Sequence, residues 1–282
     1  MPVSVRVFSL KRAHSFDIIV LVFNLFIMNY TSPVQVNEGE GDPIVLIHGL
    51  GNNYRSWTYV LDNFDYKANK VIALDLLGFG DATKPSNCGY TAEDHADAVI
   101  RALDGVGVKN AVISGHSMGS IVAAEVARKR PDLASRLVLL GAPLFKKLPK
   151  YNRFKFWKKE DAYSKLFRLI ASQKDLTLNA ANGVVQLLPL IKGMEITEET
   201  WPAFKKSLKN TILQTKSYKD LVEIKIPTEL VYGVLDLFVI KKNLKTIARK
   251  NKSYVTFTSA LGPHEITPVH GKSIAELLQK NT

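Results

Sequence analysis

Cysteine is almost missing from this chain. Cys88 is the only cysteine among 282 residues, so no intrachain disulfide can form and a cysteine-rich metal site is excluded. This composition is typical of proteins in a reducing compartment. We interpret Cys88 as an ordinary loop residue and not as a nucleophile. No cluster of metal-ligating residues and no glycine-rich dinucleotide loop is evident either, so we expect no metal and no cofactor.

Long apolar runs are also missing. Basic residues precede an apolar stretch at residues 16–28, an order that resembles a signal peptide or a membrane anchor. Asp17 and Asn24 interrupt this stretch, whereas a membrane-spanning helix needs about 20 apolar residues. Its β-branched and aromatic side chains favour a β-hairpin with strands at Asp17–Phe23 and Leu25–Val36, after a tail at residues 1–15. We therefore expect a cytoplasmic protein, with membrane anchoring or export through residues 1–28 as the alternative.

Acidic residues are few relative to basic ones, 26 against 38, which gives a net charge of +12. Much of the excess lies between Phe145 and Arg168, where only Glu160 and Asp161 oppose nine lysines and arginines, and seven aromatic residues are interleaved with them. Such a stretch suits a solvated helix face or weak association with anionic membrane surfaces. Because nothing else matches a nucleic-acid fold, we expect no nucleic-acid partner.

Short apolar segments alternate with helical ones along most of the chain. We predict strands at Ile44–Ile47, Val71–Leu74, Ala111–Ser114, Leu137–Leu140, Thr228–Tyr232 and Tyr254–Phe257, and helices near residues 57–64, 91–105, 120–130 and 271–279. Continuous apolar strands separated by helices indicate a mostly parallel sheet covered on both faces. The interval 144–221 has helical character and no buried strand, so we expect an α/β core at 16–143 and 222–282 with a helical cap inserted at 144–221.

The segment Gly115-His116-Ser117-Met118-Gly119 carries the strongest functional signal. It lies between a predicted strand and a predicted helix, which places Ser117 at the apex of a sharp turn. The flanking glycines allow such a turn, and a turn of this kind lifts the hydroxyl off the sheet toward a base that can activate it.

Other polar motifs follow the remaining strands. They are His48-Gly49-Leu50-Gly51, the loop that starts at Asp75, Gly233-Val234-Leu235-Asp236 and Gly262-Pro263-His264. In an open parallel sheet all of these loops meet at the carboxyl edge, where ligands bind.

Together the five motifs resemble the α/β-hydrolase family from about Pro43 to the C-terminus, the cap excluded. The resemblance implies eight strands with the second antiparallel, the two strands of the N-terminal hairpin being the first two. It also implies a catalytic triad of Ser117, Asp236 and His264 in the family's chain order, with the backbone N–H groups of Leu50 and Met118 forming the oxyanion hole. Leu237 and Asp81 stand where many members have proline and serine.

Each residue also has an ordinary structural interpretation. Asp236 is in a position to cap a helix, His264 to be a solvated loop residue, and His270 is the second candidate for the base. We expect His48 and His116 to be packing residues, His14 and His95 to lie at the surface, and Asp75 to hold a loop.

The resemblance implies a serine hydrolase that cleaves a carboxylic ester or a related acyl bond of a small molecule through an acyl-enzyme. The alternatives are a C–C bond hydrolase, an acyltransferase and a ligand-binding member without activity. In the cap, aromatic residues that line an acyl pocket while lysines face water would fit this activity. The sequence does not specify the substrate or the oligomeric state.

Overall fold

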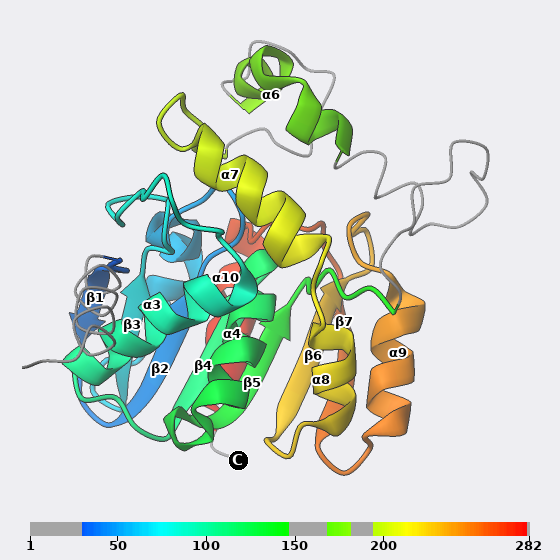
Figure 1. Ribbon diagram of the computed structural model, residues 1–282. Helices are drawn as coiled ribbons and strands as arrows, with labels where there is room; N and C mark the ends of the chain where they lie inside the picture. Colours follow the sequence, from blue (N-terminus) through cyan, green and yellow to red (C-terminus); the bar gives the residue numbers. More distant parts are fainter. Residues whose placement is uncertain (1–29, 147–167, 182–193, 281–282) are drawn as a thin grey trace, which may run out of the picture.

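A computed structural model describes residues 30–146, 168–181 and 194–280 of the chain (Figure 1). Three sequence-based expectations lie outside these residues: the tail at 1–15, the first strand at 17–23, and most of the basic, aromatic stretch, residues 147–167. His14 also lies outside the described residues. Within the described ranges, no helix is long and apolar enough to cross a membrane.

The described residues form one sheet of seven strands in the order β1-β3-β2-β4-β5-β6-β7. The strands are β1 (Val34–Glu38), β2 (Asp42–Ile47), β3 (Asn69–Leu74), β4 (Ala111–His116), β5 (Ala134–Leu140), β6 (Thr228–Gly233) and β7 (Val255–Ala260). Only β1 pairs antiparallel, with β3, and the other described pairs are parallel. The mostly parallel sheet is therefore confirmed, with seven described strands in place of the expected eight.

The antiparallel strand begins later than the sequence suggested. We expected it at Leu25–Val36, but β1 starts at Val34 and ends at Glu38. The β-branched and aromatic residues before Val34 favour extended structure, so composition alone does not mark where pairing with β3 begins.

Both faces of the central strands are buried, as their continuous apolar sequences predicted. Along β2, Ile44 and Leu46 pack on one side of the sheet, and Val45 and Ile47 pack on the other. Successive side chains of a strand point to opposite faces, so a strand buried on both sides reads as an unbroken apolar run.

Helices cover the two faces. One face carries α3 (Ala92–Gly105), α4 (Met118–Lys129), α8 (Ser217–Glu223) and α9 (Lys241–Lys250), and the other carries the short α2 (Thr58–Leu61) and α10 (Pro268–Gln279). In Figure 1, α3 and α4 lie in front of the sheet, with the red C-terminal helix behind it. The predicted helix near residues 57–64 is shorter than expected and is preceded by the 3-10 turn η1 (Tyr54–Trp57), while a second 3-10 turn, η2 (Pro131–Leu133), follows α4.

The described residues between β5 and β6 form helices and no strand. They include α6 (Lys174–Ala181), α7 (Trp201–Ser207), its π-helical continuation η4 (Leu208–Ile212), and α8. In Figure 1, α7 lies across the carboxyl ends of the strands, with α6 beyond it, whereas α8 packs beside α4 and α9. The boundaries of a cap domain at 144–221 stay a prediction.

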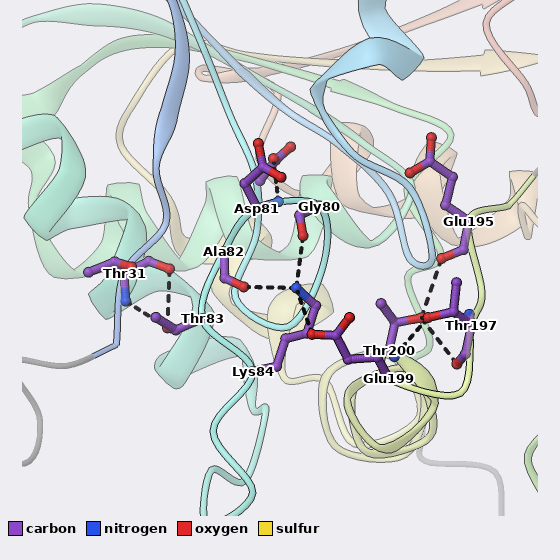
Figure 2. Close-up of polar contacts among 11 residues, drawn as sticks. Thr31, Gly80, Asp81, Ala82, Thr83, Lys84, Glu195, Thr197, Glu199 and Thr200 are labelled. Carbon is purple, nitrogen blue, oxygen red and sulfur yellow. Dashed lines mark hydrogen bonds and ion pairs between the residues drawn. The ribbon is translucent and has the colours of Figure 1, made fainter.

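The segment before α7 is attached to the loop that follows β3 (Figure 2). The Lys84 ammonium donates to the backbone carbonyls of Gly80 at 2.8 Å and Ala82 at 3.2 Å, and lies 3.7 Å from a carboxylate oxygen of Glu199. The Thr200 hydroxyl accepts from the Thr197 amide at 2.9 Å, which closes the turn that leads into α7. Among these contacts, the Lys84–Glu199 ion pair is the one that joins the loop after β3 to the start of α7.

Candidate active site

Ser117 occupies the sharp turn between β4 and α4. Its backbone has φ +54° and ψ −119°, an uncommon conformation for a residue with a side chain. Ser117 is partly exposed while the residues on either side of it are buried. Its side chain does not cap α4, although it stands at the N-cap position. The hydroxyl therefore does not make the capping hydrogen bond that a serine ordinarily makes at the start of a helix.

The turn depends on close backbone approach at its two glycines. A Cβ at Gly115 would lie 2.2 Å from the carbonyl oxygen of Gly119, and one at Gly119 would lie 2.3 Å from that of Ile47. A larger residue at Gly115 would therefore push α4 away from the end of β4, and one at Gly119 would push α4 away from β2. The Ser117 amide donates to the Leu140 carbonyl at 2.8 Å, which holds the turn against β5.

Asp236 and His264 are paired. The Nδ1 atom of His264 lies 2.7 Å from Oδ2 of Asp236, and the exposed fractions of the two side chains are 9% and 1%. The second carboxylate oxygen accepts from the Phe238 amide at 2.7 Å, so Asp236 closes its own loop and also holds the imidazole. A carboxylate at Nδ1 selects the tautomer with its proton there, which leaves Nε2 available as a base.

The paired loops lie beside the serine turn. His116, which directly precedes Ser117, lies with its ring centroid 5.0 Å from that of His264, and its Nε2 lies 2.8 Å from the His264 carbonyl oxygen. A Cβ at Gly141, at the end of β5, would lie 3.1 Å from Cε1 of His264 and 3.2 Å from Oδ2 of Asp236. The structure therefore brings together the three loops that carry the predicted triad residues.

The loop after β2 reaches the same point. A Cβ at Gly49 would lie 3.2 Å from the Cβ of Ser117, so the backbone that leads into Leu50 runs against the serine turn. Met118 is the first residue of α4, where amide N–H groups have no partner within the helix and the helix dipole is positive. Both predicted oxyanion donors thus belong to segments in contact with Ser117 or adjacent to it.

His48 holds the base of that loop. It is fully buried, accepts from the Leu76 amide at Nε2 (2.8 Å), and places Nδ1 2.8 Å from the Gly49 carbonyl. Because the amide can only donate, Nδ1 carries the proton and the ring is neutral. Burial lowers the pKa of His48 to about 4. The interpretation of His48 as a packing residue is confirmed.

Asp75 holds the neighbouring loop, as predicted. Its carboxylate accepts from the amides of Tyr54 and Asp81, both at 2.9 Å, and from the Gln35 side chain at 3.0 Å. Asp81 stands where many family members have serine, and its carboxylate accepts from the same Gln35 amide at 3.1 Å. The departure at position 81 therefore keeps this loop attached to β1.

One histidine prediction was wrong. His95 was expected at the surface but is completely buried in α3, where Nε2 lies 3.0 Å from the Ser207 hydroxyl and burial lowers its pKa to about 3. The helical spacing of Ala96 and Val99 places His95 at the edge of the apolar face. Its ring neighbours Phe79 and Tyr90 lie in the loop before α3, outside the helix, so helical periodicity cannot reveal them.

The alternative residues have other partners. Nδ1 of His270 lies 2.7 Å from the Thr267 hydroxyl and its Nε2 2.5 Å from the Leu261 carbonyl, so both ring nitrogens are occupied. Cys88 is buried, and burial raises the pKa of its thiol to about 12, which leaves it unreactive as a nucleophile. Among the described residues, no group of three or more histidine, cysteine or acidic side chains could hold a metal ion.

Two site residues were not found from the sequence. The Phe238 ring packs 4.6 Å from that of His264, and Gly141 allows the approach of the Asp236–His264 pair to β5. Phe238 is two residues after Asp236, and Gly141 directly follows β5. Their closeness in sequence to these predicted features is the signal by which they could have been found.

Comparison with known proteins agrees with this geometry. Residues 42–181 match the alpha/beta hydrolase fold family, a range that includes Leu50 and Ser117 but ends before Asp236 and His264. The chain is 32% identical over 109 residues to 2-hydroxymuconate semialdehyde hydrolase of Pseudomonas sp. (strain CF600), covering 38% of either protein. It is 35% identical over 104 residues to (E)-2-((N-methylformamido)methylene)succinate hydrolase of Acinetobacter baylyi, covering 37% of this chain and 39% of that protein.

These matches span about two fifths of the length of those relatives. The structure of a bromoperoxidase from Bacillus anthracis superposes with a TM-score of 0.65 at 22% identity, covering 86% of this chain and 92% of the other. At this identity the likeness concerns the fold. Sheet order, serine turn and sequence match agree, and the chain belongs to the α/β-hydrolase fold family.

Proposed function

We propose that the protein is a serine hydrolase that cleaves a carboxylic ester, or a related acyl bond, of a small molecule. The observation that carries this proposal is the 2.7 Å contact between Nδ1 of His264 and Oδ2 of Asp236, next to a partly exposed serine on a strained turn. An imidazole backed by a buried carboxylate is the arrangement that activates a hydroxyl in serine hydrolases.

The reaction follows from these roles. The Ser117 oxygen attacks the carbonyl carbon, and its proton passes to Nε2 of His264. The backbone N–H groups of Leu50 and Met118 stabilise the oxyanion that forms, and each such donor contributes about 3–4 kcal/mol to barrier lowering in serine hydrolases. The tetrahedral intermediate collapses, and the alcohol leaves with the proton from His264. Water, activated by the same histidine, then releases the acyl group from Ser117.

Asp236 is suited to support the charge that His264 acquires. Its side chain is almost fully buried and one of its oxygens accepts a backbone N–H, so the carboxylate is fixed before the reaction starts. A preorganised carboxylate needs no reorganisation when the imidazolium forms, which is why such pairs lower the barrier.

Turnover of p-nitrophenyl esters with graded acyl chains tests the proposal. We expect the wild type to hydrolyse at least one chain length and to be labelled by a fluorophosphonate probe, and we expect S117A to lose both properties while it remains folded. The matched control is S120A, because the Ser120 hydroxyl is buried and donates to the carbonyls of Gly115 and Leu140. A fully active S117A protein would contradict the proposal.

A second candidate substrate comes from the relatives. The sequence match to 2-hydroxymuconate semialdehyde hydrolase extends over 109 residues at 32% identity. We therefore include 2-hydroxymuconate semialdehyde in the panel. If the protein converts this compound but hydrolyses none of the esters, its substrate resembles that of the relative and the proposed ester cleavage is contradicted.

A further inference from the structure

His116 connects the serine turn to the loop that carries His264. It is the last residue of β4, is 5% exposed, and is separated by 148 positions in the chain from the backbone carbonyl that it contacts. The distance from its Nε2 to the His264 carbonyl oxygen is 2.8 Å. We expected His116 to be a packing residue, but this contact reaches the backbone of the proposed base itself.

The chemistry of the contact fixes the state of the ring. A carbonyl can only accept, so Nε2 carries the proton and donates. Nδ1 is buried and has no hydrogen-bond partner among the described residues, and it lies 3.4 Å from where a Cβ of Gly49 would be. The neutral state is consistent with burial and the nearby His264, which lower the pKa of His116 to about 4.

An apolar residue of similar size would fill this space without an unpaired nitrogen. Burying a polar atom without a partner is unfavourable, so packing alone does not account for an imidazole here. Within the part of the chain that the structure describes, the hydrogen bond that the ring makes is its donation to the His264 carbonyl. That hydrogen bond is therefore the property that distinguishes histidine from phenylalanine or leucine at this position.

We propose that His116 is a positioning residue that holds the His264 backbone at a fixed distance from Ser117. This inference rests on the proposed serine-hydrolase function. Asp236 restrains the His264 ring at Nδ1 but does not fix the backbone that carries the ring. The carbonyl contact supplies that second restraint, and since His116 is adjacent to Ser117, it ties the base directly to the nucleophile.

A pair of amide substitutions separates this role from packing. Glutamine places its side-chain N–H2 as many bonds from Cβ as Nε2 of histidine, whereas asparagine is one bond shorter and does not reach the carbonyl. We expect H116N to lower kcat by about 10- to 100-fold, the order of loss caused by a misplacement of about 1 Å, with KM changed by less than about twofold. We expect H116Q to recover most of kcat.

His95 provides a matched control. It is also a fully buried histidine with one ring nitrogen in a hydrogen bond and the other without a partner among the described residues. H95N should lower the midpoint of urea unfolding to an extent similar to H116N, and leave kcat per folded molecule unchanged.

The possible results separate the proposed function from the role of His116. Wild-type protein that neither hydrolyses the esters nor reacts with fluorophosphonate would overturn the proposed function and, with it, the role of His116. An active wild type with H116N equally active per folded molecule would overturn the positioning role alone. Equal losses of kcat in H116N and H116Q would also overturn it, because the donor's reach would then be irrelevant.

Discussion

Acid should destabilise this protein through three buried neutral histidines. His48, His95 and His116 are all buried, and burial lowers their pKa values to about 4, 3 and 4. In the unfolded chain each would titrate near its ordinary pKa of about 6.5. Between these pH values the unfolded state binds more protons than the folded state, so the free energy of unfolding falls as the pH is lowered from about 6.5 toward 4.

The magnitude follows from the size of these shifts. On going from pH 7 to pH 5, each histidine is protonated in the unfolded chain and remains neutral in the fold, which removes about 2 kcal/mol. The three together remove about 6 kcal/mol, which is comparable with the total stability of about 5–15 kcal/mol of most domains. Asp220 acts in the opposite direction, because burial and the neighbouring Glu125 raise its pKa.

Urea unfolding at pH 7, 6 and 5, followed by tryptophan fluorescence, measures this effect. H95N should be less stable than the wild type at pH 7 but should lose about 2 kcal/mol less between pH 7 and pH 5, since it has one titrating histidine fewer. Equal free energies of unfolding for the wild type at pH 7 and pH 5, or the same pH dependence in both proteins, would refute the reasoning.

Three further substitutions test other parts of the structure. Asp236→Asn should lower kcat for ester hydrolysis by about 10⁴-fold because it disturbs the tautomer of His264, and retention of wild-type kcat would contradict the assignment. Arg136→Met should lower the free energy of unfolding in urea by about 2–4 kcal/mol, because one buried guanidinium nitrogen donates to three carbonyls at the end of α10, and no change would exclude this role. Thr91→Ala should cost about 1 kcal/mol in the same assay, since it removes one of the two hydrogen bonds between Thr91 and Asp94 that begin α3; Asp97→Ala, outside this cap, is its control.

Local patterns were sufficient to predict most of the parallel sheet. The apolar runs at Ile44–Ile47 and Leu137–Leu140 became β2 and β5 because their side chains are buried on both faces, and this is visible in composition alone. The start of α3 was also predictable, because the two partners of its capping box, Thr91 and Asp94, lie within one helical turn of each other.

Features that depend on contacts between distant segments were harder to predict from the sequence. Helix α9 was not assigned, because its apolar face consists mainly of Leu244 and Ile247 among many lysines, and its burial is supplied by the sheet. The hydrogen bonds from His95 to residue 207 and from His116 to residue 264 join partners more than 100 positions apart. No periodicity within a single segment encodes such pairs.

Some residues of the candidate site were predictable from local sequence and others were not. The serine turn was visible because glycine spacing and the flanking strand and helix are local. Asp236 and His264 were assigned because their order along the chain matches that of the α/β-hydrolase family. Their 2.7 Å contact could not be predicted from sequence spacing, because 28 positions separate them.

The location of His264 has a consequence for heat inactivation. The loop that carries it follows β7, which is the last strand of the described sheet, pairs only with β6, and has most of its residues at least partly exposed. Ser117 instead follows β4, which is flanked by strands on both sides. Edge elements open at lower free energy than central ones, so on warming the base should become detached from the nucleophile while the interior of the sheet is still intact.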